Sequence, residues 1–142
     1  MKKIPLFSKI IFLVLCFSLT NCSDSNGQQK TTQAAQQNPQ MLLNPDDFEA
    51  RALQAGVQLV DVRTPAEYQS GHIADARNIN FNDPNFKANM DKLDKNKPIA
   101  VYCAAGGRSG KSANLLAQMG FKTIYDLQGG MSAWKAKGKK SN

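Results

Sequence analysis

Residues 97–120, KPIAVYCAAGGRSGKSANLLAQMG, carry the most informative pattern of the chain. The segment opens with an apolar run, residues 97–103, that is long enough for a buried central strand. Small residues then turn the chain, and a periodic helical stretch follows at 109–120 and stops at a glycine. The segment therefore predicts a strand, a tight turn that begins at Cys103, and a helix.

The flanking segments repeat this alternation of strand and helix. Helix starts are indicated by Asn or Thr directly before Pro, and Thr64 and Glu67 have the spacing of a capping box. We expect helices at residues 44–56, 64–71, 83–93 and 132–138, and strands at 57–62, 76–81 and 121–127. The alternation predicts an α/β domain with a largely parallel sheet and helices on both faces.

Parallel sheets of this kind bind ligands beyond the carboxyl ends of their strands. Asp61 ends one predicted strand and Cys103 ends another. We therefore expect both residues to lie toward the same edge of the sheet, and we take this edge as the place to look for chemistry.

The turn after Cys103 is suited to holding an anion. Successive backbone N–H groups of such a turn can point at one spot, and the start of the following helix adds partial positive charge. Gly106, Gly107 and Gly110 permit the backbone conformations and the close approach that this requires. Arg108 adds a permanent charge and a planar set of donors for an incoming oxyanion.

A thiolate at this spot is stabilised relative to its thiol, so the pKa of Cys103 is expected to be low and its sulfur nucleophilic. No general base is then needed. His72 is the one histidine of the chain, and nothing in the sequence places it beside Cys103. We interpret His72 as a hydrogen-bonded structural residue.

The N-terminus has the pattern of an exported protein. MKKIPLFSK is basic and precedes a short apolar run, which predicts a signal peptide at residues 1–21. Cys22 follows "LTN" and is the predicted lipidation site of a periplasmic or outer-membrane-associated bacterial lipoprotein, with Asn21 departing from the usual small residue. Residues 22–40 are polar and predict a flexible linker.

Charge and cysteine count exclude several classes of protein. The formal net charge is +7, but basic and acidic residues are equal in number between Cys22 and Trp134. The excess lies in three lysines of the signal segment and in four lysines at the C-terminus, Lys135, Lys137, Lys139 and Lys140. The basic tail at residues 139–142 is interpreted as a solvated end, so nucleic-acid binding is not expected. Cys103 is the one cysteine of the mature domain, which excludes an internal disulfide, and no cluster of Cys and His suggests a metal.

Three ordered blocks resemble the rhodanese family of sulfurtransferases in its single-domain form. They are LVDVRTPAEYQSGHIADARNIN, VYCAAGGRSGKSANLLAQMGF and LQGGMSAWKAKG. The resemblance implies a rhodanese domain at residues 41–138, with a three-layer α/β sandwich around about five parallel strands, and we expect a monomer. It implies that Cys103 takes the outer sulfur of a small anionic donor such as thiosulfate, carries it as a persulfide, and passes it to a thiol or to cyanide. No cofactor is implied.

The resemblance also implies a set of residues around the persulfide. Those that would bind the donor are Ala104, Ala105, Gly106, Gly107, Arg108 and Ser109. Asp61, Arg63 and Lys111 are candidates for supporting the pocket. For Arg63, an ion pair with Asp61 or Glu67 that fixes the turn is the favoured alternative, and Lys111 can equally face solvent.

Two other functions remain open from the sequence. Certain phosphatases and arsenate reductases use a cysteine and an arginine around an anion, but with a loop one residue longer and with a general acid, a role for which no residue stands out in this sequence. A non-catalytic binding or sensing module is the second alternative, although such modules often lack the cysteine. Gly129 and Gly130 are expected to form a turn near the pocket, and Trp134 is expected in the core.

Overall fold

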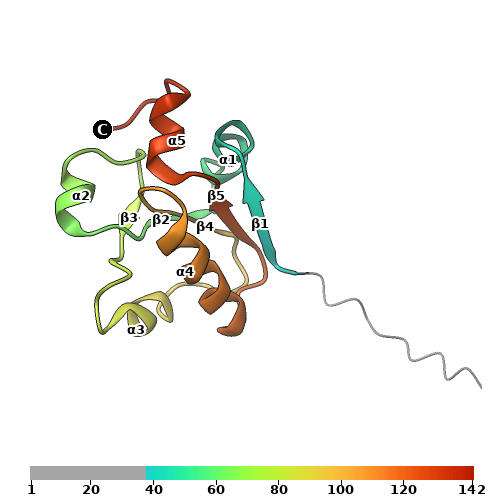
Figure 1. The fold of residues 1–142 in the computed structure, drawn as a ribbon. Helices are drawn as coiled ribbons and strands as arrows, with labels where there is room; N and C mark the ends of the chain where they lie inside the picture. The colour runs from blue at the N-terminus through green and yellow to red at the C-terminus, as the bar shows by residue number, and fades with distance from the viewer. Residues whose placement is uncertain (1–37) are drawn as a thin grey trace, which may run out of the picture. The chain divides into compact units, whose positions relative to one another are not determined.

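The computed structural model describes residues 38–142, which form a parallel sheet between two layers of helices (Figure 1). The sheet has five strands in the order β1-β5-β4-β2-β3. The strands are β1 (Gln40–Leu43), β2 (Gln58–Asp61), β3 (Arg77–Asn78), β4 (Ile99–Tyr102) and β5 (Ile124–Leu127). The helices are α1 (Pro45–Ala52), α2 (Pro65–Gln69), α3 (Phe86–Met90), α4 (Gly107–Gln118) and α5 (Gly130–Ala136). The predicted three-layer α/β architecture is confirmed.

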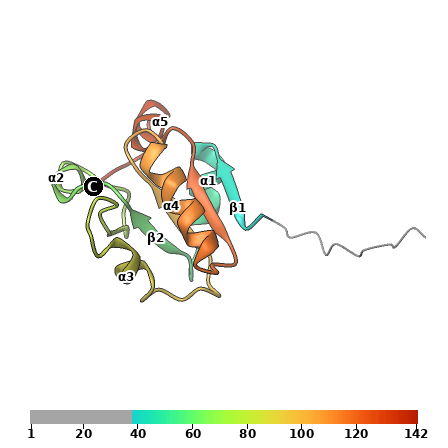
Figure 2. The same cartoon turned by 60° about the horizontal axis from the view of Figure 1, so that its bottom comes forward.

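The central strand β4 divides the core into two halves. Ile99 and Val101 pack on one face of the sheet with residues of α3 and α4. Ala100 and Tyr102 pack on the other face with residues of α1 and α5. All four side chains are fully buried, because successive side chains of a strand alternate between the faces and both faces are covered. Figure 2 shows α4 lying across the sheet on the opposite side from α1.

The local signals in the sequence produce the predicted starts of α1 and α2, whereas the helix predicted at 83–93 is reduced to Phe86–Met90 and has no side-chain cap. The side chain of Asn44 accepts hydrogen bonds from the amides of Asp46 and Asp47 at the start of α1. Thr64 and Glu67 form the full capping box of α2. These bonds satisfy backbone donors that the first helical turn would otherwise leave unpaired.

One strand was not predicted. β1 pairs in parallel with β5, with Gln40 opposite Ile124, so Gln40 belongs to the sheet and not to the linker. The segment is short, follows polar residues, and holds only three apolar residues in a row, which gave no alternating pattern to recognise. The predicted strand at 76–81 is also reduced to the two residues of β3 at the sheet edge.

The interpretation of residues 139–142 as a solvated tail holds only in part, because residues 140–142 are exposed but the segment is bonded to the domain. The Nζ atom of Lys139 lies 2.9 Å from a carboxylate oxygen of Asp46 and 2.6 Å from one of Glu49, on α1. The backbone of Asn142 exchanges two hydrogen bonds with that of His72. The tail therefore folds onto the domain, because the acids of α1 offer the lysine a partner that solvent alone does not.

The signal peptide, Cys22 and nearly all of the predicted linker lie outside the described residues. Within residues 38–142, none of the helices is both long and apolar enough to cross a bilayer.

Candidate active site

Two strand ends meet at the carboxyl edge of the sheet, as predicted. Asp61, the last residue of β2, is in register with Tyr102, the last residue of β4. Cys103 follows directly, and α4 begins at Gly107. The connection between strand and helix is thus only four residues long, and it places the thiol at the amino end of α4.

The chain wraps around the sulfur of Cys103. The amide of Gly106 donates a hydrogen bond to Sγ at 3.1 Å, and Gly106 adopts a left-handed conformation with φ 98° as the N-cap of α4. A residue with a side chain rarely adopts this conformation, so glycine is needed at this position. Cys103 is 1% exposed, so its sulfur lies at the bottom of the loop.

The surroundings of Cys103 favour its thiolate. Burial raises the pKa of the thiol, but hydrogen bonds from the amide and hydroxyl of Ser109 and from the amides of Ala105 and Gly106 lower it by more. The net result is a pKa below the ordinary value for cysteine. The backbone donors that the sequence predicted around this atom are therefore present, and they act on the sulfur itself.

Arg108 extends from the first turn of α4 toward α2. Its Nη1 and Nη2 atoms donate to the two carboxylate oxygens of Glu67 at 2.8 and 2.6 Å. Both side chains are partly exposed, at 25% for Arg108 and 34% for Glu67. The hydrogen bond from Arg108 is the main reason that the pKa of Glu67 is lowered to about 2, so the carboxylate stays ionised. Sequence reasoning considered Glu67 as part of the Thr64 capping box and as a possible partner of Arg63, but not as a partner of Arg108.

Arg63 instead pairs with Asp61, the other partner considered. Arg63 Nη2 donates to Asp61 Oδ2 at 2.6 Å and to the carbonyl of Gly71 at 2.7 Å, and the Arg63 amide donates to Asp61 Oδ1 at 2.8 Å. Asp61 is completely buried and Arg63 is 4% exposed. These bonds hold the turn between β2 and α2, which carries Glu67 toward the loop.

The remaining residues considered in the sequence have different environments. Lys111 is exposed on α4. The His72 ring stacks on Tyr68, with Nδ1 3.1 Å from the Tyr68 carbonyl, as expected for a structural residue. Trp134 is 1% exposed, which confirms its predicted place in the core.

Gly129 and Gly130 pack against the backbone of the loop, which confirms a turn beside it. The amide of Met131 donates to the carbonyl of Cys103 at 2.8 Å, and that of Ser132 donates to the carbonyl of Ala104 at 2.9 Å. Gly130 has φ 58°, and a Cβ there would overlap the Cys103 carbonyl oxygen and lie 2.8 Å from the carbonyl carbon of Ala104. The amino end of α5 therefore forms a wall that fixes the path of the loop.

Asp126 is a buried acid beside the site that sequence reasoning missed. It is 6% exposed, and its Oδ1 atom is buried without a hydrogen-bond partner among the described residues. Burial raises the pKa of Asp126 to about 6, although a hydrogen bond with Ser109 partly offsets this. The signal was available, because an acid inside the apolar strand 121–127, close to its carboxyl end, is unusual at a buried position.

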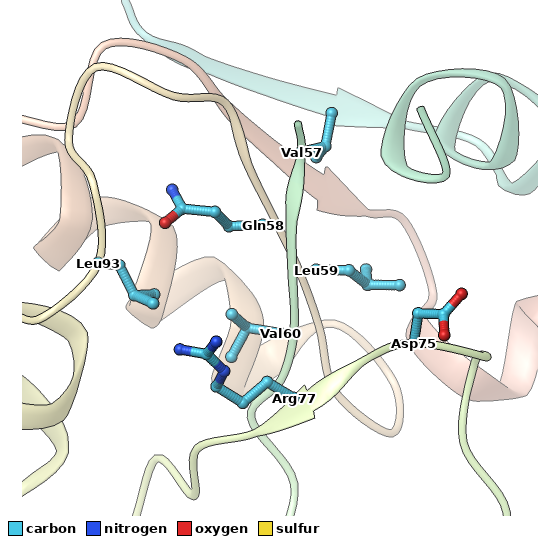
Figure 3. Close-up of a pocket in the computed structure, with 7 residues that line it drawn as sticks. All are labelled: Val57, Gln58, Leu59, Val60, Asp75, Arg77 and Leu93. Carbon is cyan, nitrogen blue, oxygen red and sulfur yellow. The ribbon is translucent and has the colours of Figure 1, made fainter. Parts of the chain in front are cut away.

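A separate hollow lies beside β2 and β3 (Figure 3). Its volume is about 200 Å³, and Val60, Arg77 and Leu93 are among its lining residues. None of the residues 103–109 lines it, so it is distinct from the edge that carries Cys103. Within residues 38–142, no three His, Cys, Asp or Glu side chains are grouped so as to hold a metal ion.

The family model for the rhodanese-like domain matches residues 44–137. The chain belongs to the rhodanese-like family. YqhL of Bacillus subtilis is 38% identical over 102 residues, which are 72% of this chain and 78% of that protein. The thiosulfate sulfurtransferase GlpE of Coxiella burnetii is 38% identical over 80 residues, which are 56% of this chain and 73% of GlpE.

Solved rhodanese-like structures share the fold. A rhodanese-related protein of Thermoplasma volcanium superposes with a TM-score of 0.63 at 30% identity, covering 71% of this chain and 96% of that protein. A rhodanese-like domain protein of Staphylococcus aureus gives a TM-score of 0.58 at 32% identity, covering 66% and 91%. The family and fold that the three sequence blocks implied are confirmed, and the family includes sulfurtransferases.

Proposed function

We propose that the protein is a sulfurtransferase that moves sulfane sulfur from an anionic donor such as thiosulfate to a thiophilic acceptor through a persulfide on Cys103. The observation that carries the proposal is the sulfur of Cys103, which accepts a hydrogen bond from the Gly106 amide at 3.1 Å and has a lowered pKa. Such a sulfur is ionised more readily than free cysteine and is a nucleophile without a separate base.

Two steps complete the transfer. The Cys103 thiolate attacks the outer sulfur of thiosulfate, a new S–S bond forms, and the old S–S bond breaks with its electron pair leaving on sulfite. A thiolate or cyanide acceptor then attacks the outer sulfur of the persulfide and releases the Cys103 thiolate. Neither step needs an external oxidant or reductant. The amides of residues 104–109 offer hydrogen bonds to the persulfide, whose terminal sulfur carries the negative charge.

The loop length favours this chemistry over phosphate transfer. Arg108 is five positions after Cys103, and the relatives that match the chain include proteins named as thiosulfate sulfurtransferases. The hydrogen bonds that Ala105, Gly106 and Ser109 offer to the Cys103 sulfur favour catalysis over a purely binding role.

Sulfur loading of the full chain tests the proposal. Exposure to thiosulfate is expected to add one sulfur atom to Cys103, seen by intact mass and located by peptide mapping, and a thiol reductant is expected to remove it. Cys103→Ser is the matched control, because Cys16 and Cys22 remain in the chain. Equal loading of the two proteins, or no adduct on Cys103 at any thiosulfate concentration, would overturn the proposal.

We also propose that the protein acts outside the cytoplasm, tethered by lipid on Cys22. The support is the basic and apolar pattern of residues 1–21 with a cysteine directly after it. Intact mass of the protein from its native membrane is expected to correspond to loss of residues 1–21 and addition of acyl groups. A mass equal to that of the unprocessed chain would contradict this.

A further inference from the structure

The guanidinium that would orient the donor is already occupied. Both terminal nitrogens of Arg108 donate to Glu67, one to each carboxylate oxygen. A bidentate pair of this kind uses the same planar donors that would bind the oxygens of thiosulfate. A donor therefore meets a neutralised arginine, and it has to replace Glu67 in order to bind Arg108 with the same geometry.

Glu67 is held in place independently of Arg108. Its Oε2 atom accepts hydrogen bonds from the amide of Thr64 at 3.0 Å and from the hydroxyl of Thr64 at 2.8 Å. These bonds belong to the capping box of α2, which the buried Asp61–Arg63 pair positions. When a donor draws Arg108 away, the carboxylate remains near the site and repels the negative charge of the donor.

Among residues 38–142, few other charges oppose this repulsion, and Lys111 is exposed on α4. The Cys103 thiolate is itself negative, and the charge of Asp61 is balanced by Arg63 at 2.6 Å. Asp126 lies behind Ser109 and adds no positive charge. The site therefore offers a dianion the backbone donors of the loop and the start of α4, together with one arginine that a carboxylate neutralises.

We propose that Glu67 is a specificity-determining residue that competes with the anionic end of the donor for Arg108, so that the site disfavours doubly charged donors relative to singly charged ones. The inference rests on the proposed sulfurtransferase function. Thiosulfate and methanethiosulfonate are a matched pair of probes, because both present an outer sulfur on an oxidised sulfur centre but carry two charges and one charge. With the second probe, the thiolate takes the outer sulfur and methanesulfinate leaves with the electron pair.

Glu67→Gln tests the role of the charge while preserving the helix start, since Gln also fits the third position of a capping box. The measurement is kcat/KM for each donor with the same acceptor. The ratio for thiosulfate over methanethiosulfonate is expected to rise about three- to tenfold at low salt, the scale of one charge interaction near a protein surface. The rise is expected to shrink as salt screens the charge.

Asp91→Asn is the matched control for the change in net charge. Asp91 forms an ion pair with Lys95. The carbonyl of Lys95 accepts a hydrogen bond from the amide of Lys122, which lies just before β5. The pair is therefore at the amino ends of the strands, opposite the edge that carries Cys103. This variant is expected to leave the donor ratio unchanged. A merely structural role for Glu67 would change both kcat/KM values together and leave their ratio constant.

A second measurement separates this inference from the proposed function. The alkylation rate of Cys103 by anionic iodoacetate, divided by that of neutral iodoacetamide, is expected to rise in Glu67→Gln whether or not sulfur is transferred. If Cys103 loads with sulfur but Glu67→Gln changes neither the donor ratio nor the alkylation ratio, the role of Glu67 is refuted and the proposed function stands. A fall in the ratio of thiosulfate to methanethiosulfonate would refute that role in the same way. A raised alkylation ratio in a protein that no donor loads would support that role while refuting the sulfurtransferase.

Discussion

Two arginine–carboxylate pairs lie at the same edge of the sheet and differ mainly in burial. Asp61–Arg63 and Glu67–Arg108 each have a shortest N–O distance of 2.6 Å. In the first pair the side chains are at most 5% exposed, whereas in the second they are 25% and 34% exposed. Arg63 bonds through Nε and Nη2 and Arg108 through Nη1 and Nη2, but the chemistry and the shortest distance are the same. The main difference between the pairs is therefore access to water and ligand.

Burial assigns the two pairs different tasks. Arg63 also bonds to the carbonyl of Gly71, so its pair ties the β2–α2 turn to the segment that follows α2, and a side chain only 5% exposed presents little surface to a ligand. Arg108 has only Glu67 as a hydrogen-bond partner for its guanidinium among the described side chains, and solvent reaches both groups. A half-exposed ion pair contributes little to stability and can exchange partners, whereas a buried one cannot lose a partner cheaply.

The largest expected effect on stability comes from Asp61→Asn. It leaves the Arg63 guanidinium buried without a counter-charge, which typically costs about 3–5 kcal/mol. Urea unfolding of the full chain measures the loss, and Glu67→Gln is expected to lose less than about 1 kcal/mol in the same assay. A loss below about 1 kcal/mol for Asp61→Asn would mean that the two pairs are equivalent and that burial does not distinguish them.

Gly130→Ala disturbs the loop that carries Arg108 to Glu67. The new Cβ would overlap the carbonyl groups of Cys103 and Ala104, and alanine disfavours φ 58°. We expect a loss of about 3 kcal/mol in the free energy of unfolding. Gly107→Ala is the control for stability, because a Cβ there meets no atom within 4 Å, and urea unfolding is expected to show a change below about 1 kcal/mol. Similar losses in both variants would mean that the wall of α5 does not fix the loop.

Local signals in the sequence predicted the fold and the loop, because their causes are local. Asn44 and the Thr64–Glu67 capping box act within one helical turn, and the apolar run at β4 needs no distant partner to be recognised. The Cys103 loop was also recognisable, since its glycines and its donor amides are adjacent in sequence, although the amino end of α5, which helps to fix its path, is not.

Features that depend on distant residues could not be predicted in the same way. Arg108 and Glu67 are 41 positions apart, and only the packing of α2 beside the loop brings them together. β1 exists because β5 offers it a free edge, not because Gln40–Leu43 has a strong strand pattern. The contact of Lys139 with α1 also depends on distant residues, since its acidic partners lie about 90 residues earlier.

Asp126 differs from the acids of both pairs, because it is a buried carboxyl that pairs with no cation among residues 38–142. Its pKa is raised from 3.8 to about 6, so the folded state holds its proton at pH values where the unfolded chain has lost it. Stability from this group is therefore present below about pH 4 and is lost as the pH rises to about 6. Asp126→Asn removes the cost of the buried charge, and urea unfolding is expected to show a gain of about 2 kcal/mol at pH 8 and none near pH 4. A gain that does not depend on pH would contradict this account.

The smallest expected effect on stability comes from Arg108→Gln. Glu67 keeps its bonds to Thr64, and both partners of the lost pair are already in contact with water, so the free energy of unfolding is expected to fall by no more than about 1 kcal/mol. Loading of Cys103 by thiosulfate is nevertheless expected to slow at least about tenfold, because the uncompensated carboxylate then repels the donor. If Arg108→Gln instead lowered the free energy of unfolding as much as Asp61→Asn does, Arg108 would be a structural residue like Arg63. Its exposure would then not mark it as available to a ligand. Slow loading of Cys103 together with nearly unchanged stability is the result expected only if the Arg108–Glu67 pair faces the ligand.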